Sequence, residues 1–143
     1  MEKVTVILDR KQSHFRHIAS SSTVHAALCR MSCEGTDHLA VMDEDSRFIG
    51  VITEHDIASS VLVDELPMTK TLVSRLVNRQ LPIATTEDTV EQCLQRMRQY
   101  NVKLLPVFEG FQFKGIVTAE DILQEAADCR MRIFDEDRSM VAY

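Results

Sequence analysis

The chain has 143 residues, 45% hydrophobic and 27% charged, and its 16 basic and 22 acidic residues give a formal net charge of −6. This composition is typical of a soluble globular protein. The acidic excess disfavours nucleic acid as a partner. No apolar run approaches the ~18 residues of a membrane helix, so we expect no direct membrane insertion. Four scattered cysteines and the lack of a signal peptide predict a cytoplasmic location.

The first half of the chain reads as a short strand, a helix, a two-stranded hairpin and a closing helix. After a lead-in at residues 2–10, these elements are expected at residues 15–19, 23–32, 38–42 with 48–52, and 55–63. Thr23 is a preferred helix-capping residue type, and the apolar residues that follow it recur at helical spacing. The hairpin turn is the acidic stretch at 43–46.

The second half repeats this order after a linker at 64–70 and a short helix at 71–78. Its elements are expected at residues 81–84, 89–100, 103–108 with 113–117, and 119–130. Each half would be marginally stable alone, so the halves are expected to share a core. We divide the chain into a first repeat with its lead-in at 1–66, a second repeat with its linker helix at 67–130, and a C-terminal tail at 131–143. The tail carries Asp135-Glu136-Asp137 and is either frayed or docked on a partner chain.

An octapeptide shows the duplication most clearly. The segment GVITEHDI, which begins at Gly50, returns 65 positions later at Gly115 as GIVTAEDI. The preceding helix and first hairpin strand repeat at an offset of 66, and a one-residue deletion in the hairpin turn explains the change. A glycine inside a strand marks close approach of another backbone or of a ligand, and both meanings fit Gly50 and Gly115.

The repeated order resembles the CBS domain, and residues 15–127 resemble a tandem pair, a Bateman module. The resemblance implies an α/β (α+β) fold of two β-α-β-β-α repeats packed sheet to sheet about a pseudo-twofold axis. It also implies a non-catalytic regulatory module that forms a homodimer and binds an adenosine compound in clefts between the copies. AMP is the favoured ligand; ADP, ATP, S-adenosylmethionine and NAD are alternatives. An effector protein in trans would read the signal.

Each octapeptide places a hydroxyl and a carboxylate where a strand leads into a helix. A carboxylate can accept both hydroxyl hydrogens of a ribose, so Asp56 and Asp121 are the candidate ribose contacts. Thr53 and Thr118 would face the ribose or the phosphate, near the free N–H groups of the helix start. The same Thr-x-x-Asp spacing is also a helix-capping signature, and capping alone explains one such match equally well.

The adenine slot follows from the resemblance alone. Similar modules line it with the early strand and the start of the hairpin, which correspond here to Ile18, Ala19, Leu39, Ala40, Ile83, Ala84, Leu105 and Pro106. Many similar domains carry Arg or Lys between the Thr and the Asp, but this chain has Glu54-His55 and Ala119-Glu120. His55 would help only when protonated. A monophosphate or an uncharged adenosine moiety therefore fits better than a polyphosphate. Five basic residues could reach a site from neighbouring strands or be solvated: Arg16, His38, Arg47, Lys103 and Lys114.

Other functions have weaker support. His25, Cys29 and Cys33 follow helical spacing, but a fourth metal ligand is missing, so we expect no metal and no obligatory cofactor. Cys93 takes the position of Ala27 and is expected to fill the core. No catalytic triad order or phosphate-binding loop is present, so we expect no enzyme activity. The alternative to a ligand sensor is a structural homodimerisation scaffold with empty clefts.

Overall fold

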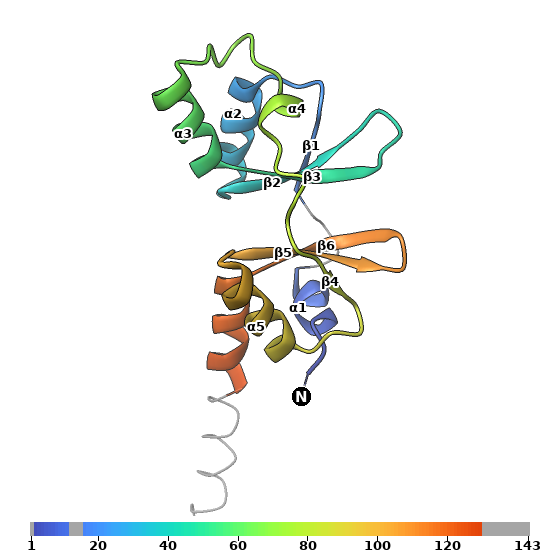
Figure 1. The fold of residues 1–143 in the computed structure, drawn as a ribbon. Coiled ribbons are helices and arrows are strands. Elements are labelled where there is room, and N and C mark those ends of the chain that lie inside the picture. Colours follow the sequence, from blue (N-terminus) through green and yellow to red (C-terminus); the bar gives the residue numbers. More distant parts are fainter. Residues whose placement is uncertain (1, 12–15, 130–143) are drawn as a thin grey trace, which may run out of the picture. The chain divides into compact units, whose positions relative to one another are not determined.

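The structure is a computed structural model, and it describes residues 2–11 and 16–129 (Figure 1). The predicted tail at 131–143 lies outside the described residues. The chain forms two compact units, one of His14–Leu81 and the other of Met1–Ser13 together with Pro82–Tyr143.

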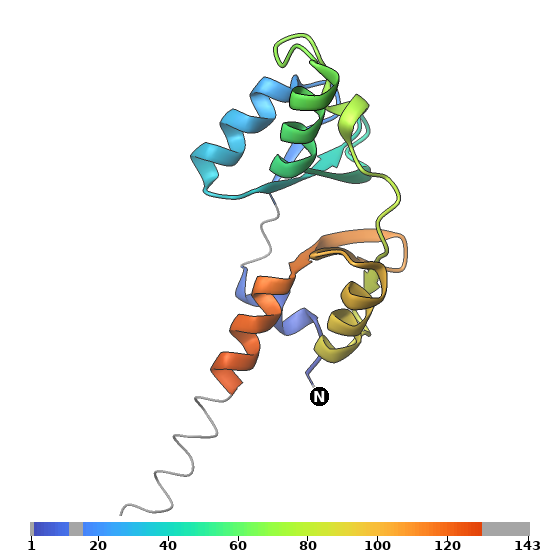
Figure 2. The same ribbon diagram turned by 60° about the vertical axis from the view of Figure 1, so that its left-hand side comes forward.

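The unit of His14–Leu81 is a three-stranded sheet with helices on one face (Figure 2). Its elements are β1 (His17–Ala19), α2 (Val24–Glu34), β2 (His38–Met42), β3 (Phe48–Thr53), α3 (Glu54–Asp64) and α4 (Val73–Leu76). In the strand order β1-β2-β3, β1 runs parallel to β2 and β3 runs antiparallel to it. Side chains from the sheet and from all three helices form one apolar core, which includes Leu39, Ile52 and Val73.

The other unit has the same topology. Its elements are α1 (Thr5–Arg10), β4 (Ala84–Thr85), α5 (Val90–Tyr100), β5 (Leu104–Glu109), β6 (Gln112–Thr118) and a closing helix that is described over residues 119–129. The strand order is β4-β5-β6, with one parallel and one antiparallel pair. The predicted α+β fold and the β-α-β-β-α order of both repeats are confirmed.

Threonine caps begin the helices where the sequence predicts them. The Oγ1 atom of Thr23 accepts the Ala26 N–H at 3.1 Å, and Thr89 forms a complete capping box with Gln92. Left-handed residues end the same two helices, Gly35 after α2 and Asn101 after α5. The helix boundaries are therefore encoded locally.

Strand β4 begins later than the predicted strand at 81–84. Pro82 has no N–H to donate to a strand partner, so regular pairing starts only at Ala84, which lies opposite Val107. In the first unit Ile18 lies opposite Val41, so Ile18 and Ala84 occupy matching positions. The predicted helix at 71–78 is also shorter in the structure, because α4 ends at Leu76.

The lead-in packs on the second repeat, whereas the sequence analysis placed it with the first. Val4 is fully buried in the core that contains Leu105, and its N–H donates to Asp88 O at 2.9 Å. The linker and its short helix, residues 64–78 and together called the linker below, belong to the unit of the first repeat, whereas the linker helix was predicted to belong to the second. This linker makes the matching contact there, since the Val73 N–H donates to Ser22 O at 2.8 Å. Each segment supplies an apolar side chain and backbone hydrogen bonds to the repeat on which it packs. The position of a segment in the sequence does not reveal which of the two repeats it completes.

Candidate functional site

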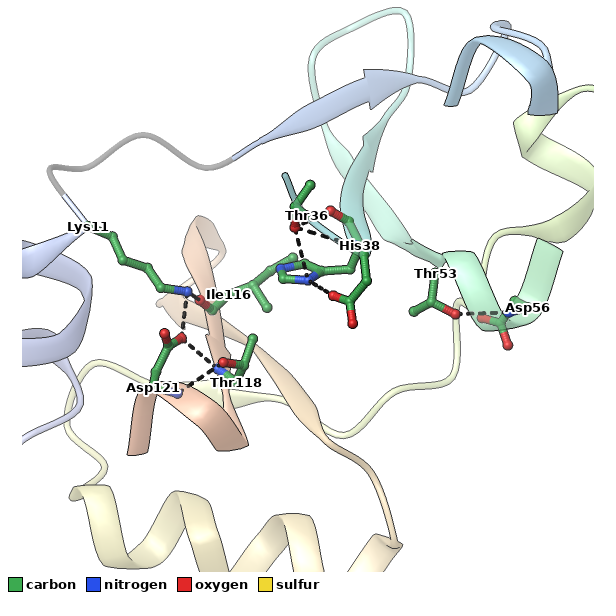
Figure 3. Close-up of polar contacts among 9 residues, drawn as sticks. Lys11, Thr36, His38, Thr53, Asp56, Ile116, Thr118 and Asp121 are labelled. Carbon is green, nitrogen blue, oxygen red and sulfur yellow. Dashed lines mark hydrogen bonds and ion pairs between the residues drawn. The ribbon is translucent and has the colours of Figure 1, made fainter. Parts of the chain in front are cut away.

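In the first repeat, the candidate pair lies where β3 leads into α3 (Figure 3). Thr53 is the N-cap of α3, and its Oγ1 accepts the Asp56 N–H at 3.1 Å. Among the residues that the structure describes, none forms a hydrogen bond or an ion pair with the Asp56 carboxylate. That side chain is half-buried, and both of its oxygens are available as acceptors.

A polar group borders this position. His38 is the strand partner of Thr53, and its Nδ1 lies 3.0 Å from Asp37 Oδ1 and 3.5 Å from Thr36 Oγ1 (Figure 3). The corresponding strand partner of Thr118 is Leu104, an apolar residue. Of the five basic candidates, His38 is therefore the one that the sheet places beside a site threonine. His55 lies exposed in the first turn of α3.

In the second repeat, the candidate carboxylate is already engaged. The Thr118 N–H donates to Asp121 Oδ2 at 2.9 Å, and the Asp121 N–H donates to Thr118 Oγ1 at 3.1 Å. Lys11 Nζ lies 2.5 Å from the same Asp121 Oδ2 and donates to Ile116 O at 2.9 Å (Figure 3). Asp121 is thus a helix cap and an ion-pair partner, and the two predicted ribose contacts are not equivalent.

The residues of the predicted adenine slot fall into two groups. Four of them are buried in the apolar core of their own repeat: Ile18, Leu39, Ala84 and Leu105. Their side chains pack under the helices, and Leu39 and Leu105 lie in the central strands β2 and β5, which pair with a neighbouring strand on each side. Ala40 and Pro106 are also buried but alternate to the opposite face of the sheet. Ala19 is exposed, and Ile83 is 48% exposed.

A salt bridge fixes the start of the second repeat. Arg96 Nη1 donates to Asp88 Oδ2 at 2.8 Å and to Ile83 O at 3.0 Å, and the Thr85 N–H also donates to Asp88 Oδ2 at 2.8 Å. Burial by itself raises the pKa of Asp88, but these hydrogen bonds and the Arg96 charge outweigh it and lower the pKa below its usual range. The Ile83 carbonyl is therefore already an acceptor for a side chain of this repeat.

We expect Arg96→Met to lower the free energy of unfolding by about 1–2 kcal/mol at pH 7, because it removes charged hydrogen bonds to a largely buried carboxylate. The folded-state pKa of Asp88 is depressed, so its stabilisation is present above the unfolded pKa of about 3.9 and is lost as pH falls through the folded pKa. Urea unfolding from pH 7 to pH 3 measures both effects.

The matched control is Arg30→Met. Arg30 occupies the corresponding helix position in the first repeat, where its guanidinium pairs with Glu34 of the same helix at 3.5 Å. Its replacement should change stability by less than about 0.5 kcal/mol. Equal losses in the two variants, or a loss in Arg96→Met that does not depend on pH, would contradict a structural role for the Asp88–Arg96 pair.

Both strand glycines are approached by the protein itself. A Cβ atom on Gly50 would overlap the carbonyl oxygen of Asn78 and lie 2.8 Å from Val77 Cγ2. A Cβ atom on Gly115 would lie 3.1 Å from Leu8 Cδ2 of α1. Close approach of another backbone, one of the two meanings left open by the sequence, is therefore found at Gly50, whereas Gly115 is approached by a side chain.

The remaining candidates are dispersed. Lys114 Nζ lies 3.8 Å from Glu109, while Arg16, Arg47 and Lys103 are exposed. Sequence reasoning missed Lys11, whose ammonium reaches the carboxylate of Asp121, because no local pattern links these two residues.

The cysteines divide by burial. His25 Nε2 and Cys29 Sγ lie 3.6 Å apart on α2, and Cys29 and Cys33 are exposed. Cys93 is fully buried, which confirms it as a core residue, and burial together with the nearby Asp88 charge raises the pKa of its thiol to about 11. None of the helices in the described ranges is long and apolar enough to cross a membrane.

These duplicated sheets and paired strand-to-helix sites define a tandem repeat protein of the regulatory CBS class. The CBS domain model matches residues 12–63 and 73–128, and the chain belongs to the CBS domain family. This family is generally regulatory and non-catalytic. The crystal structure of the CBS domain NE2398 superposes with a TM-score of 0.82 at 24% identity, covering 89% of this chain and 99% of that one.

Two further similarities concern ligands and context. The CBS domain pair of protein MJ0100, solved in complex with 5′-methylthioadenosine and S-adenosyl-L-methionine, superposes with a TM-score of 0.75 at 25% identity, covering 90% of this chain and 98% of that one. A homoserine O-acetyltransferase of Methanosphaerula palustris is 26% identical over 119 residues, which are 82% of this chain and 23% of that protein. The chain therefore spans about a quarter of that relative's length.

Proposed function

We propose that this protein is a non-catalytic sensor that binds an adenosine-containing ligand at the strand-to-helix junctions of its repeats and signals occupancy to an effector protein. The observation that carries the proposal is the Asp56 carboxylate at the start of α3. It is half-buried, it has no bonding partner among the described residues, and it lies one helical turn from the capping Thr53. A ribose diol offers two hydroxyl donors that match its two oxygens.

The structural neighbour with bound 5′-methylthioadenosine and S-adenosyl-L-methionine supports an adenosine compound as the ligand class. AMP is the favoured ligand here, with ADP, ATP, S-adenosylmethionine and NAD as alternatives. Neither Thr-x-x-Asp motif contains a basic residue other than His55, so a ligand with little phosphate charge is favoured. The backbone of edge strand β1 is suited to reading the adenine edge beside Ala19 and Ala40.

We further propose that the protein acts in the cytoplasm as a homodimer. Large apolar side chains are exposed on the closing helices: Leu62 and Val63 on α3 are 80% and 78% exposed, and Leu123 is 66% exposed. A second copy would bury such side chains. The same exposed residues favour the alternative function, a dimerisation scaffold that binds no nucleotide.

A thermal-shift panel distinguishes the two functions. The protein is heated with AMP, ADP, ATP, NAD, S-adenosylmethionine or adenosine, with GMP as the control, and its mass in solution is measured by light scattering. A ligand at 100 times its dissociation constant stabilises by about 2.7 kcal/mol, which raises Tm by several degrees. A selective shift with adenosine compounds is expected. A dimer that shifts with no nucleotide would be a scaffold.

A further inference from the structure

Lys11 places a cation at the candidate site of the second repeat, and the described residues of the first repeat offer no counterpart. Its ammonium lies against Asp121 Oδ2 and the Ile116 carbonyl, and Asp121 Oδ2 also accepts the Thr118 N–H. Two donors therefore share one oxygen of a carboxylate that would need both oxygens to hold a ribose diol. Lys11 and Asp121 are 35% and 22% exposed, so this pair is only partly hydrated.

The position of Lys11 is fixed by the packing of α1. Arg10, the last residue of α1, pairs with Glu125 at 2.6 Å and with Asp128 at 2.7 Å. Glu125 is 3% exposed, so this anchor reaches into the second repeat. Leu8, two residues earlier in α1, lies beside β6, where a Cβ atom on Gly115 would be 3.1 Å from Leu8 Cδ2. Contacts on both sides of the helix thus deliver the Lys11 side chain to the start of the closing helix.

The linker that plays the same part in the first repeat carries no such cation. Val4 of the lead-in and Val73 of the linker are both fully buried, and each donates a backbone hydrogen bond to its repeat. These two residues therefore correspond, which aligns the two segments at an offset of 69 residues. At this offset Gln80 corresponds to Lys11. Moreover, the linker leaves its helix at Leu76 and pairs with β3 through Asn78, so it follows a different path. Within the described ranges, no cation forms an ion pair with Asp56.

We propose that Lys11 is an intramolecular competitor for the ribose-binding carboxylate of the second repeat. The inference rests on the proposed function, because it assigns regulation to one of its two sites. A ligand at Asp121 must displace the Lys11 ammonium, whereas no side chain of the described residues pairs with the Asp56 carboxylate. The first repeat is therefore filled at lower ligand concentration, and occupancy of the second repeat is coupled to release of Lys11 from the closing helix.

Adenosine is the appropriate probe, because it carries the ribose diol and no phosphate that the lysine would attract. Binding is measured by calorimetry in an Asp56→Ala background, which leaves the second repeat as the available site. Adding Lys11→Met keeps the length of the side chain and removes its charge. We expect roughly fivefold tighter binding, the size of effect that a partly exposed ion pair can supply. Lys11→Arg should bind as weakly as the parent.

Two controls isolate the effect. Lys3→Met removes a charge from the same segment at an exposed pair with Glu87 and should leave affinity unchanged. Separately, the effects of Lys11→Met and Asp121→Asn on urea unfolding should be non-additive in a double-mutant cycle without ligand. Additive effects, or unchanged or weaker adenosine binding in Lys11→Met, would overturn the competitor role while leaving the sensor function in place. Absence of binding in every variant and in the wild type would overturn both.

Discussion

Asp56→Ala is expected to weaken adenosine binding to the first repeat by about 10-fold to 100-fold. The substitution removes the acceptor for two ribose hydroxyls, and a net loss of about 1.4–2.8 kcal/mol, the size expected for hydrogen bonding to a partly exposed charged group, corresponds to this range. Folding should be nearly unaffected, because the capping bond to Thr53 uses the Asp56 backbone N–H and not its side chain. Calorimetry on the full chain measures the dissociation constant.

The matched control is Glu54→Ala, which removes the same charge from the same helical turn at an exposed position. It should leave adenosine affinity within about twofold, the change expected for a screened surface charge. Asp56→Ala is a cleaner test than Asp121→Ala, because the Asp121 side chain also caps its helix and pairs with Lys11. Equal dissociation constants for Asp56→Ala and wild type would remove Asp56 from the ribose site.

Gly50→Ala should destabilise the protein by about 3 kcal/mol. The new methyl group would overlap Asn78 O, which accepts the Val51 N–H at 3.1 Å, while the Asn78 N–H donates to Val51 O at 2.9 Å. Accommodating the methyl group means moving the linker away from β3, so both hydrogen bonds and the Val77 contact are lost. Urea unfolding would show a lower midpoint.

Gly35→Asn is the control for this substitution. Gly35 has φ of +65°, which asparagine tolerates, and a Cβ atom there meets nothing within 4 Å. Its cost should be below about 1 kcal/mol. Wild-type stability of Gly50→Ala would mean that the linker is not held against β3, and it would return Gly50 to the set of ligand-facing positions.

Much of the fold was predictable because its determinants are local. Thr23 and Thr89 begin helices through bonds to backbone groups three residues away, and the apolar residues that follow repeat at helical spacing. The candidate pairs Thr53 with Asp56 and Thr118 with Asp121 were found in the same way, since the spacing is short and occurs twice. Strand β4 starts later than the sequence pattern predicts, because Pro82 has no N–H to donate to a strand partner.

The duplication, the order of elements, the family and the two Thr-x-x-Asp positions can all be predicted from the sequence, because each depends on spacing along the chain. The segment that completes each repeat, and the candidate carboxylate that has no partner among the described residues, become clear from the folded chain alone. Lys11 contacts Ile116, which lies 105 positions later in the chain, and also Asp121. These contacts form because the buried Val4 and the Arg10–Glu125 ion pair hold α1 against the second repeat. Such pairing depends on the complementarity of distant surfaces, and a periodic pattern along the chain carries no record of it.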